Sequence, residues 1–201
     1  MEVIIHRVNN VKKLISTPNH FGAEIDIRTY GSKIILNHDP FKKGENFEDF
    51  LTEYKHGTLI LNIKEDGIED EVLNKVKKAK IKSFFLLDVE FPYIYKSIKK
   101  KERNISIRFS EKETIETAKI MVNKFKWLWI DTVTKLPITK DNINIINKYK
   151  SCLVCPERWG RANQIELYKK KLIKLKFIPS AIMTSSKYAY QWLELNHLKT
   201  W

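Results

Sequence analysis

The segment AEIDIRTYGSKIILNHD carries charged side chains in an alternating pattern. Glu24, Asp26 and Arg28 stand two residues apart, and the following apolar run ends in His38 and Asp39. Residues two apart on a β-strand point to the same face. Carboxylate oxygens are the ligands that hard divalent cations take, and imidazoles exchange protons near neutral pH. Because two acids and an arginine make a poor hydrophobic layer, we interpret this face as part of a functional site.

Polar side chains of similar kinds close the other strand-like runs of the chain. They are His6 and Arg7, Asn62 and Lys64, Asp88, Arg108, Asp131 and Glu157. In a barrel of parallel strands, catalytic groups lie at the carboxyl ends of the strands and on the loops that follow. The regular placement of these residues predicts a functional rim at one end of such a barrel.

The elements that would position them follow from the hydrophobic pattern. Eight apolar runs are each followed by an amphipathic one; the apolar runs are EVIIHR, AEIDIR continued by KIILNHD, TLILNIK, SFFLLDVE, NISIRFS, WLWIDTV, SCLVCPE and SAIMTSS. Strands that are apolar on both faces are typical of parallel sheets covered by helices. We predict an α/β fold, a compact (β/α)₈ TIM barrel forming a single domain over residues 1–201, with an open doubly wound sheet as the alternative.

The chain is strongly basic, with a formal charge of +13 and a pI near 9.6. An anionic partner would explain this charge, and so would lysines spread over solvated helix faces such as LNKVKKAK and LYKKKLIKLK. We favour the second explanation and expect no nucleic-acid partner, because the sequence has no Gly-Arg tract, zinc-finger spacing or aromatic-basic RNA motif. An RNA-associated protein remains a third alternative.

Cysteine usage and hydropathy bear on location. Cys152 and Cys155 form a C-x-x-C pair within a strand-like run, where residues three apart face opposite sides, and one such pair cannot complete a zinc site. The N-terminal run leaves no room for a signal peptide, and no apolar stretch approaches the roughly twenty residues that span a bilayer. We therefore expect a cytoplasmic protein without a membrane span, and the oligomeric state stays open.

Four motifs in the first third of the chain resemble one enzyme family. IIHR, GAEIDIR, LNHDP and LILNIK are similar, in this order, to the His-Arg, Glu-x-Asp, His-Asp and Glu-x-Lys pattern of the glycerophosphodiester phosphodiesterases. These enzymes belong to the phospholipase-C-like phosphodiesterase barrels. The chain would be a short, divergent member that lacks the family's usual insertion after His-Asp.

The resemblance implies a role for each matched residue. It implies proton transfer by His6 and His38, a divalent cation (Mg²⁺ or Ca²⁺) held by Glu24 and Asp26, and a substrate phosphate held by Arg7 and Lys64. In the family a neighbouring hydroxyl of the substrate attacks the phosphorus and gives a cyclic phosphate that water then opens. Asn62 stands where the family has a third metal-binding glutamate, and we take Asp88 as the candidate replacement carboxylate beside it.

Other residues extend the predicted rim. Arg108 is a further candidate phosphate ligand, and the remaining candidates are Arg28, Asp39, Asp131, Glu157, Arg161 and Lys187. Arg161 lies near the start of a helix, where anions are favoured. The alternatives are structural: a core histidine at His6, ion pairs of Glu24 and Asp26 with Arg7 and Arg28, a turn at His38 capped by Asp39, and ion pairs among Arg108, Asp131 and Glu157.

The function that these expectations favour is a metal-dependent phosphodiesterase with His/His general acid–base catalysis. Its substrate would be a small soluble phosphodiester, either glycerophosphodiester-like or a nucleotide- or polyol-phosphate precursor of surface polysaccharide. The alternative is a catalytically degenerate barrel that binds a phosphate ligand and has lost turnover through Asn62.

Overall fold

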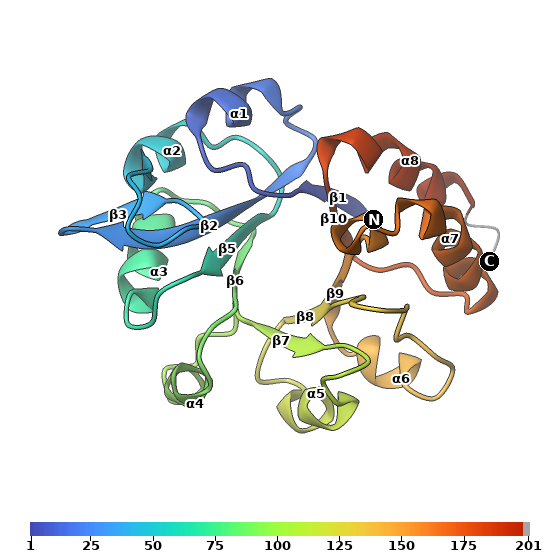
Figure 1. The fold of residues 1–201 in the computed structure, drawn as a ribbon. Coiled ribbons are helices and arrows are strands. Elements are labelled where there is room, and N and C mark those ends of the chain that lie inside the picture. Colours follow the sequence, from blue (N-terminus) through green and yellow to red (C-terminus); the bar gives the residue numbers. More distant parts are fainter. Residues whose placement is uncertain (199–201) are drawn as a thin grey trace. The chain divides into compact units, whose positions relative to one another are not determined.

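The computed structural model describes residues 1–198, a mixed α/β chain in which strands and helices alternate (Figure 1). The chain divides into two compact units. The N-terminal unit is Ile4–Lys100, and the C-terminal unit is Met1–Val3 together with the described residues from Lys101 onward. None of the helices within residues 1–198 is long and apolar enough to cross a bilayer.

The N-terminal unit contains a parallel sheet in the order β1–β2–β5–β6. Its strands are the end of β1 (Glu2–Ile5), of which Ile4 and Ile5 belong to this unit and pair with β2, then β2 (Gly22–Tyr30), β5 (Leu59–Ile63) and β6 (Phe84–Leu87). Every residue of β5 and β6 is buried, as expected of parallel strands covered on both faces. The register pairs Asp26 of β2 with Asn62 of β5, which places two of the predicted site residues side by side.

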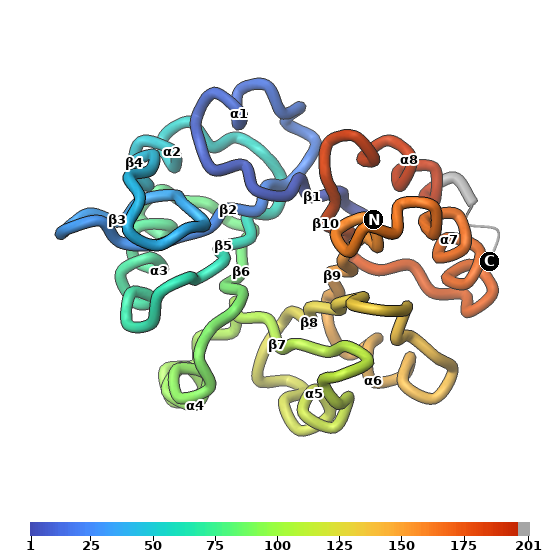
Figure 2. The backbone as a smooth tube through the Cα atoms, in the orientation of Figure 1, coloured from blue at the N-terminus to red at the C-terminus, as the bar shows by residue number. Residues whose placement is uncertain are grey.

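A β-hairpin extends this sheet beyond its parallel part. After Asp26, β2 continues to Tyr30, reverses at Gly31 and pairs antiparallel with β3 (Lys33–Leu36), which pairs in turn with β4 (Glu45–Asn46). Figure 2 shows the path of this hairpin. The sequence pattern predicts AEIDIR and KIILNHD as one continuous run, and the hairpin corrects this prediction. Gly31, at a φ of 61°, allows the left-handed turn that separates them.

The N-terminal unit has four α-helices, which alternate with its parallel strands along the chain. They are α1 (Val11–Ser16), α2 (Phe47–Glu53), α3 (Glu69–Lys78) and α4 (Phe91–Lys99). Asn10 and Asn46 cap the first two, each accepting a hydrogen bond from a backbone N–H of the first turn. In α3, acids occupy the first turn and lysines the last, as the helix dipole favours, while Val72 and Val76 are buried.

The C-terminal unit repeats the alternation. Its parallel strands, in the order β10–β9–β8–β7, are β7 (Ser106–Phe109), β8 (Trp127–Ile130), β9 (Lys150–Val154) and β10 (Ala181–Thr184). Its α-helices are α5 (Ile115–Met121), α6 (Ile143–Ile146), α7 (Ile165–Lys174) and α8 (Ala189–Leu193). The 3₁₀ turns are η1 (Pro156–Trp159), η2 (Ala162–Gln164), η3 (Ser186–Tyr188) and η4 (Glu194–Leu198). The backbone N–H of Glu2 donates to the carbonyl of Ser180, which joins the start of the chain to this unit.

The predicted alternation of parallel strands and helices is therefore confirmed. Closure of the strands into one barrel, and a single domain over the whole chain, stay predictions. The two cysteines are free and buried, and burial raises the pKa of the Cys155 thiol to about 11, which is the state of a structural rather than a reactive cysteine.

Candidate functional site

Two buried acids lie at the centre of the site. Glu24 and Asp26, on one face of β2, are 0% and 1% exposed. Burial and, second, the negative charge of Asp26 raise the pKa of Glu24 to about 7, against the opposing hydrogen bonds from Asn62 and the backbone of Arg7. Near neutral pH, Glu24 is therefore poised between its protonated and charged forms.

Asp26 is surrounded by donors and cations. The side-chain amide of Asn9 donates to Oδ2 of Asp26 at 2.8 Å, and the backbone N–H of Asp26 donates back to Oδ1 of Asn9 at 2.8 Å. Nε of Arg7 lies 3.6 Å from Oδ2, and Nζ of Lys64 lies 3.6 Å from Oδ1. This carboxylate is thus held in a fixed orientation beside two positive charges.

Glu24 contacts the first strand's histidine and arginine. The backbone N–H of Arg7 donates to Oε2 of Glu24 at 2.7 Å, and Nε2 of His6 lies 3.9 Å from the same oxygen. Arg7 has a φ of 54°, a left-handed conformation that costs free energy in a residue with a Cβ. Asp88, directly after β6, has a φ of 56°. Strained backbone therefore follows two of the parallel strands at the positions where the sequence predicts the site.

Asn62 and Lys64 connect the acids to the next strand. The Nδ2 of Asn62 donates to Oε1 of Glu24 at 2.8 Å and to Oδ1 of Asp26 at 3.4 Å. Its Oδ1 is buried and has no hydrogen-bond partner. The ammonium of Lys64 donates to Oδ2 of Asp88 at 3.3 Å, so Lys64 bridges Asp26 and Asp88. In this structure the carboxylate of Asp88 is therefore ion-paired with Lys64.

The donor set of this cluster can be tested against a divalent cation. Mg²⁺ and Ca²⁺ take carboxylate and amide oxygens. Glu24 and Asp26 supply carboxylates, and a half-turn of the Asn62 amide would direct its unpaired Oδ1 toward both of them. Within residues 1–198, no group of three or more His, Cys, Asp or Glu side chains is placed to hold a metal ion. The oxygens of Glu24, Asp26 and Asn62 are therefore suitable ligands for a hard cation. They would bind it with two negative charges, one fewer than a set of three carboxylates.

His38 lies on the loop after β3, which hydrogen bonds anchor to Asp26 and Arg28 of β2. The backbone N–H of Asn37 donates to the carbonyl of Asp26 at 3.0 Å, and Nε of Arg28 donates to the carbonyl of His38 at 3.0 Å. Nδ1 of His38 lies 3.0 Å from Oδ1 of Asp39, and this contact together with Lys42 lowers the pKa of Asp39 to about 2. Arg28 thus supports the loop, and the half-exposed imidazole is oriented by its neighbouring acid.

The remaining rim candidates all belong to the C-terminal unit, and each has contacts there. Arg108 pairs with Glu113 at 2.8 Å and with Asp131 at 2.9 Å. Glu157 accepts from the backbone N–H of Ser185 at 2.8 Å. Arg161 donates to the carbonyls of residues 132–134, and Nζ of Lys187 lies 5.3 Å from the ring centroid of Tyr188. Of the ion pairs in the structural alternative, the one between Arg108 and Asp131 is present, whereas Glu157 contacts Ser185 instead. A role of these residues toward phosphate stays a prediction.

Two site residues were not found from the sequence. Asn9 is hydrogen-bonded to both the carboxylate and the backbone N–H of Asp26, as described above. Lys13 of α1 donates its ammonium to the carbonyls of His6 and Arg7, at 3.1 and 2.7 Å, and burial lowers its pKa. The available signal was their position directly after the first strand, in HRVNNVKK, where loops of a parallel barrel carry site residues.

No family model matches the chain, and no curated protein matches it. The case for a function therefore depends on the four motifs and on the contacts of the N-terminal unit. These contacts combine an imidazole, a buried acid of raised pKa and two cations around a second acid. Such a set can hold an anion and exchange a proton with it.

Proposed function

We propose that the protein is a metal-dependent phosphodiesterase acting on a small phosphodiester. The observation that carries this proposal is the arrangement around β2. Nε2 of His6 lies 3.9 Å from the carboxylate of Glu24, while Arg7 and Lys64 flank Asp26 in the same cluster. A histidine beside a buried carboxyl group whose pKa is raised to about 7 is a pairing suited to proton transfer, which supports the proposal.

In this proposal each residue has a defined task. The guanidinium of Arg7 and the ammonium of Lys64 hold the phosphoryl oxygens. His6 accepts the proton of the attacking hydroxyl, and Glu24 stabilises the imidazolium that forms. His38, oriented by Asp39, donates a proton to the leaving oxygen. Mg²⁺ or Ca²⁺, held by Glu24, Asp26 and Asn62, would neutralise charge on the phosphoryl oxygens.

The substrate we infer is a diester with a hydroxyl next to the phosphate. Glycerophosphodiesters have this chemistry, as do nucleotide- or polyol-phosphate precursors of surface polysaccharide. The proposal includes closure of the eight parallel strands into a TIM barrel, with Arg108 and the other rim candidates facing the same phosphate, and a cytoplasmic location.

The alternative is a barrel that binds a phosphate ligand without turning it over. The contacts of Asn62 favour it, because the amide brings no charge where a third carboxylate would hold the cation more strongly. The two functions share the anion site and differ in whether a bond is cleaved.

The test is hydrolysis of a panel of small phosphodiesters with Mg²⁺, Ca²⁺ or Mn²⁺, and with EDTA. We expect turnover that needs the metal and that falls by about 10²–10⁴ in His38→Ala, the range for loss of a general acid. His20→Ala, an exposed loop histidine, is the matched control and should leave the rate unchanged. Ligand binding without turnover across the panel would support the alternative and end the phosphodiesterase proposal.

A further inference from the structure

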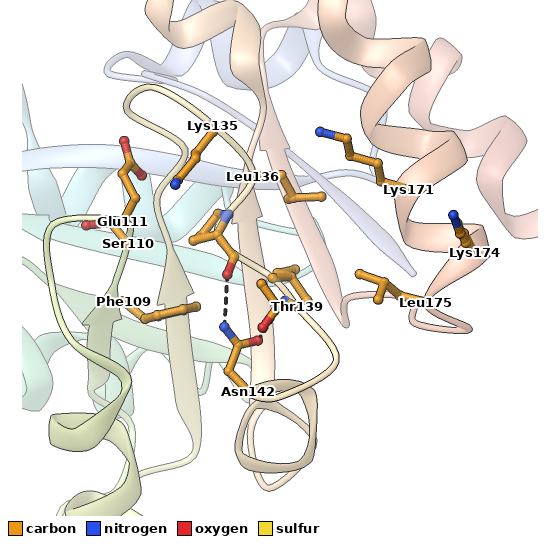
Figure 3. Close-up of a pocket in the computed structure, with 12 residues that line it drawn as sticks. Phe109, Ser110, Glu111, Lys135, Leu136, Thr139, Asn142, Lys171, Lys174 and Leu175 are labelled. Atoms are coloured by element: carbon orange, nitrogen blue, oxygen red, sulfur yellow. Dashed lines mark hydrogen bonds between the residues drawn. The ribbon is translucent and has the colours of Figure 1, made fainter.

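A cavity of about 590 Å³ opens within the C-terminal unit (Figure 3). Three segments line it: the end of β7, the loop that follows β8, and the end of α7. All the lining residues belong to this unit, and none of them belongs to the cluster around β2. The volume lies within the range of small-molecule sites in proteins.

The walls of the cavity are mainly apolar. Phe109, Leu136 and Ile138 line it and are 4–7% exposed, so their side chains are fixed by the core behind them. Pro137 and Leu175 complete this surface. An apolar surface of this size in a concave site is suited to the hydrocarbon part of a ligand.

Three lysines lie among the lining residues. Lys135 comes from the loop after β8, and Lys171 and Lys174 stand one turn apart at the end of α7 (Figure 3). All three are exposed, and no ion-pair partner for their ammonium groups is found among residues 1–198. The dipole of α7 favours cations at its last turn, which explains the two helical lysines. It does not explain Lys135, which belongs to a different segment.

The loop that carries Lys135 is held in place by hydrogen bonds. Asn142 accepts from the backbone N–H of Thr139 and donates to the carbonyl of Pro137, both at 2.9 Å (dashed lines in Figure 3). Oε1 of Glu111, the single acid of the lining, accepts from the hydroxyl of Thr134 at 2.8 Å, which ties this side chain to the loop, while its buried Oε2 has no hydrogen-bond partner. A site built in advance loses little conformational entropy when it binds a ligand.

We propose that this cavity binds a medium-chain fatty acid. The positive charge of Lys135, Lys171 and Lys174 would attract the carboxylate, and the alkyl chain would lie against Phe109, Leu136 and the neighbouring apolar residues. The lining carries three lysines and one glutamate on mainly apolar walls, so it is net positive and complementary to a single-chain anionic amphiphile. The proposal is independent of the phosphodiesterase site.

The test is calorimetric titration of the full chain with octanoate, at concentrations below micelle formation, and with 1-octanol as the uncharged counterpart. We expect saturable octanoate binding at one site and binding of octanol weaker by about tenfold. A variant combining Lys135→Gln, Lys171→Gln and Lys174→Gln should lose octanoate affinity by a similar factor. Because these side chains are exposed, the variant should fold, as circular dichroism would check.

The matched control removes the same charge elsewhere in the unit. Lys124→Gln, Lys148→Gln and Lys170→Gln together change three exposed lysines outside the cavity and should leave octanoate affinity unchanged. A second variant, Leu175→Glu, places a negative charge at the apolar wall and should abolish binding. The proposal is wrong if octanoate does not saturate, if octanol binds equally well, or if the two triple variants behave alike. It is also wrong if sedimentation shows a dimer that only the cavity variant dissociates, since a second copy would then cover this face.

Discussion

At the scale of single residues, the chemistry of the site around β2 depends on the protonation of two neighbouring acids. Glu24 and Asp26 lie on one buried face of β2, and the cations and amides around Asp26 leave Glu24 as the acid that holds a proton more readily. A raised pKa in the folded state means that the folded protein binds this proton more tightly than the unfolded chain does.

This gives a prediction for stability against pH in metal-free protein. Glu24 favours folding most below its ordinary pKa of 4.5, and this contribution is lost as the pH rises toward about 7, where the folded-state proton dissociates. The loss in free energy of unfolding should be about 1–3 kcal/mol. Urea unfolding between pH 4 and pH 8 measures it, and Glu24→Gln should remove that part of the slope. An unchanged slope in this variant would contradict the assignment.

Asn62 gives a second prediction at this scale. Asn62→Asp supplies a third carboxylate toward Glu24 and Asp26, so Mg²⁺ or Ca²⁺ should bind at least about tenfold more tightly. Without metal, the added like charge should lower the free energy of unfolding by about 1–3 kcal/mol. Calorimetric titration and urea unfolding measure the two effects. Asn147→Asp, at an exposed position, is the control, and equal metal affinity in both variants would count against the cation site.

At the scale of the elements, the hairpin after β2 decides where His38 lies. The loop between β3 and β4 begins at Asn37, whose N–H is bonded to Asp26, and closes at Gly44. A Cβ at Gly44 would lie 2.2 Å from the carbonyl oxygen of Leu36, so the backbone there approaches β3 too closely for any other residue. The turn at Gly31 is different, because a Cβ would meet open space there and only the left-handed φ favours glycine.

The two glycines should therefore respond differently to alanine. Gly44→Ala should destabilise the protein by about 2 kcal/mol or more and lower diester turnover, because the loop that carries His38 must shift. Gly31→Ala should cost about 1 kcal/mol, from backbone strain alone, with turnover kept. Urea unfolding and rate measurements compare the pair. If both variants keep full activity, the loop does not position a catalytic histidine.

The elements also show how far the sequence could predict this molecule. The alternating apolar and amphipathic runs were sufficient for the parallel strands and their helices. Predicting Glu24 and Asp26 on one face of a strand next to the strand of Asn62 was sufficient to bring them together, although β2 runs on to Tyr30 beyond them. The hairpin turn was missed because TYGSK interrupts two apolar runs by only a few residues. Asn9 and the orientation of the Asn62 amide were missed because they depend on tertiary hydrogen bonds rather than on a periodic pattern.

At the scale of the whole molecule, the excess of lysine is distributed over helix faces and the cavity of the C-terminal unit. We expect no specific nucleic-acid partner. Retention on immobilised polynucleotide should therefore be weak at physiological salt, and substitution of Arg7 or Lys64 should not alter it. Tight, steeply salt-dependent retention that these substitutions abolish would instead place a nucleic acid in the candidate site.

The central claim is that His6 and the acids of β2 act on one phosphate. The most direct measurement follows a glycerophosphodiester by ³¹P nuclear magnetic resonance, with Ca²⁺ or Mg²⁺, in the wild type and in His6→Gln. We expect loss of the diester signal and growth of a cyclic or monoester phosphate signal in the wild type alone. A diester signal that shifts on binding but is never consumed, or equal consumption by His6→Gln, would contradict it.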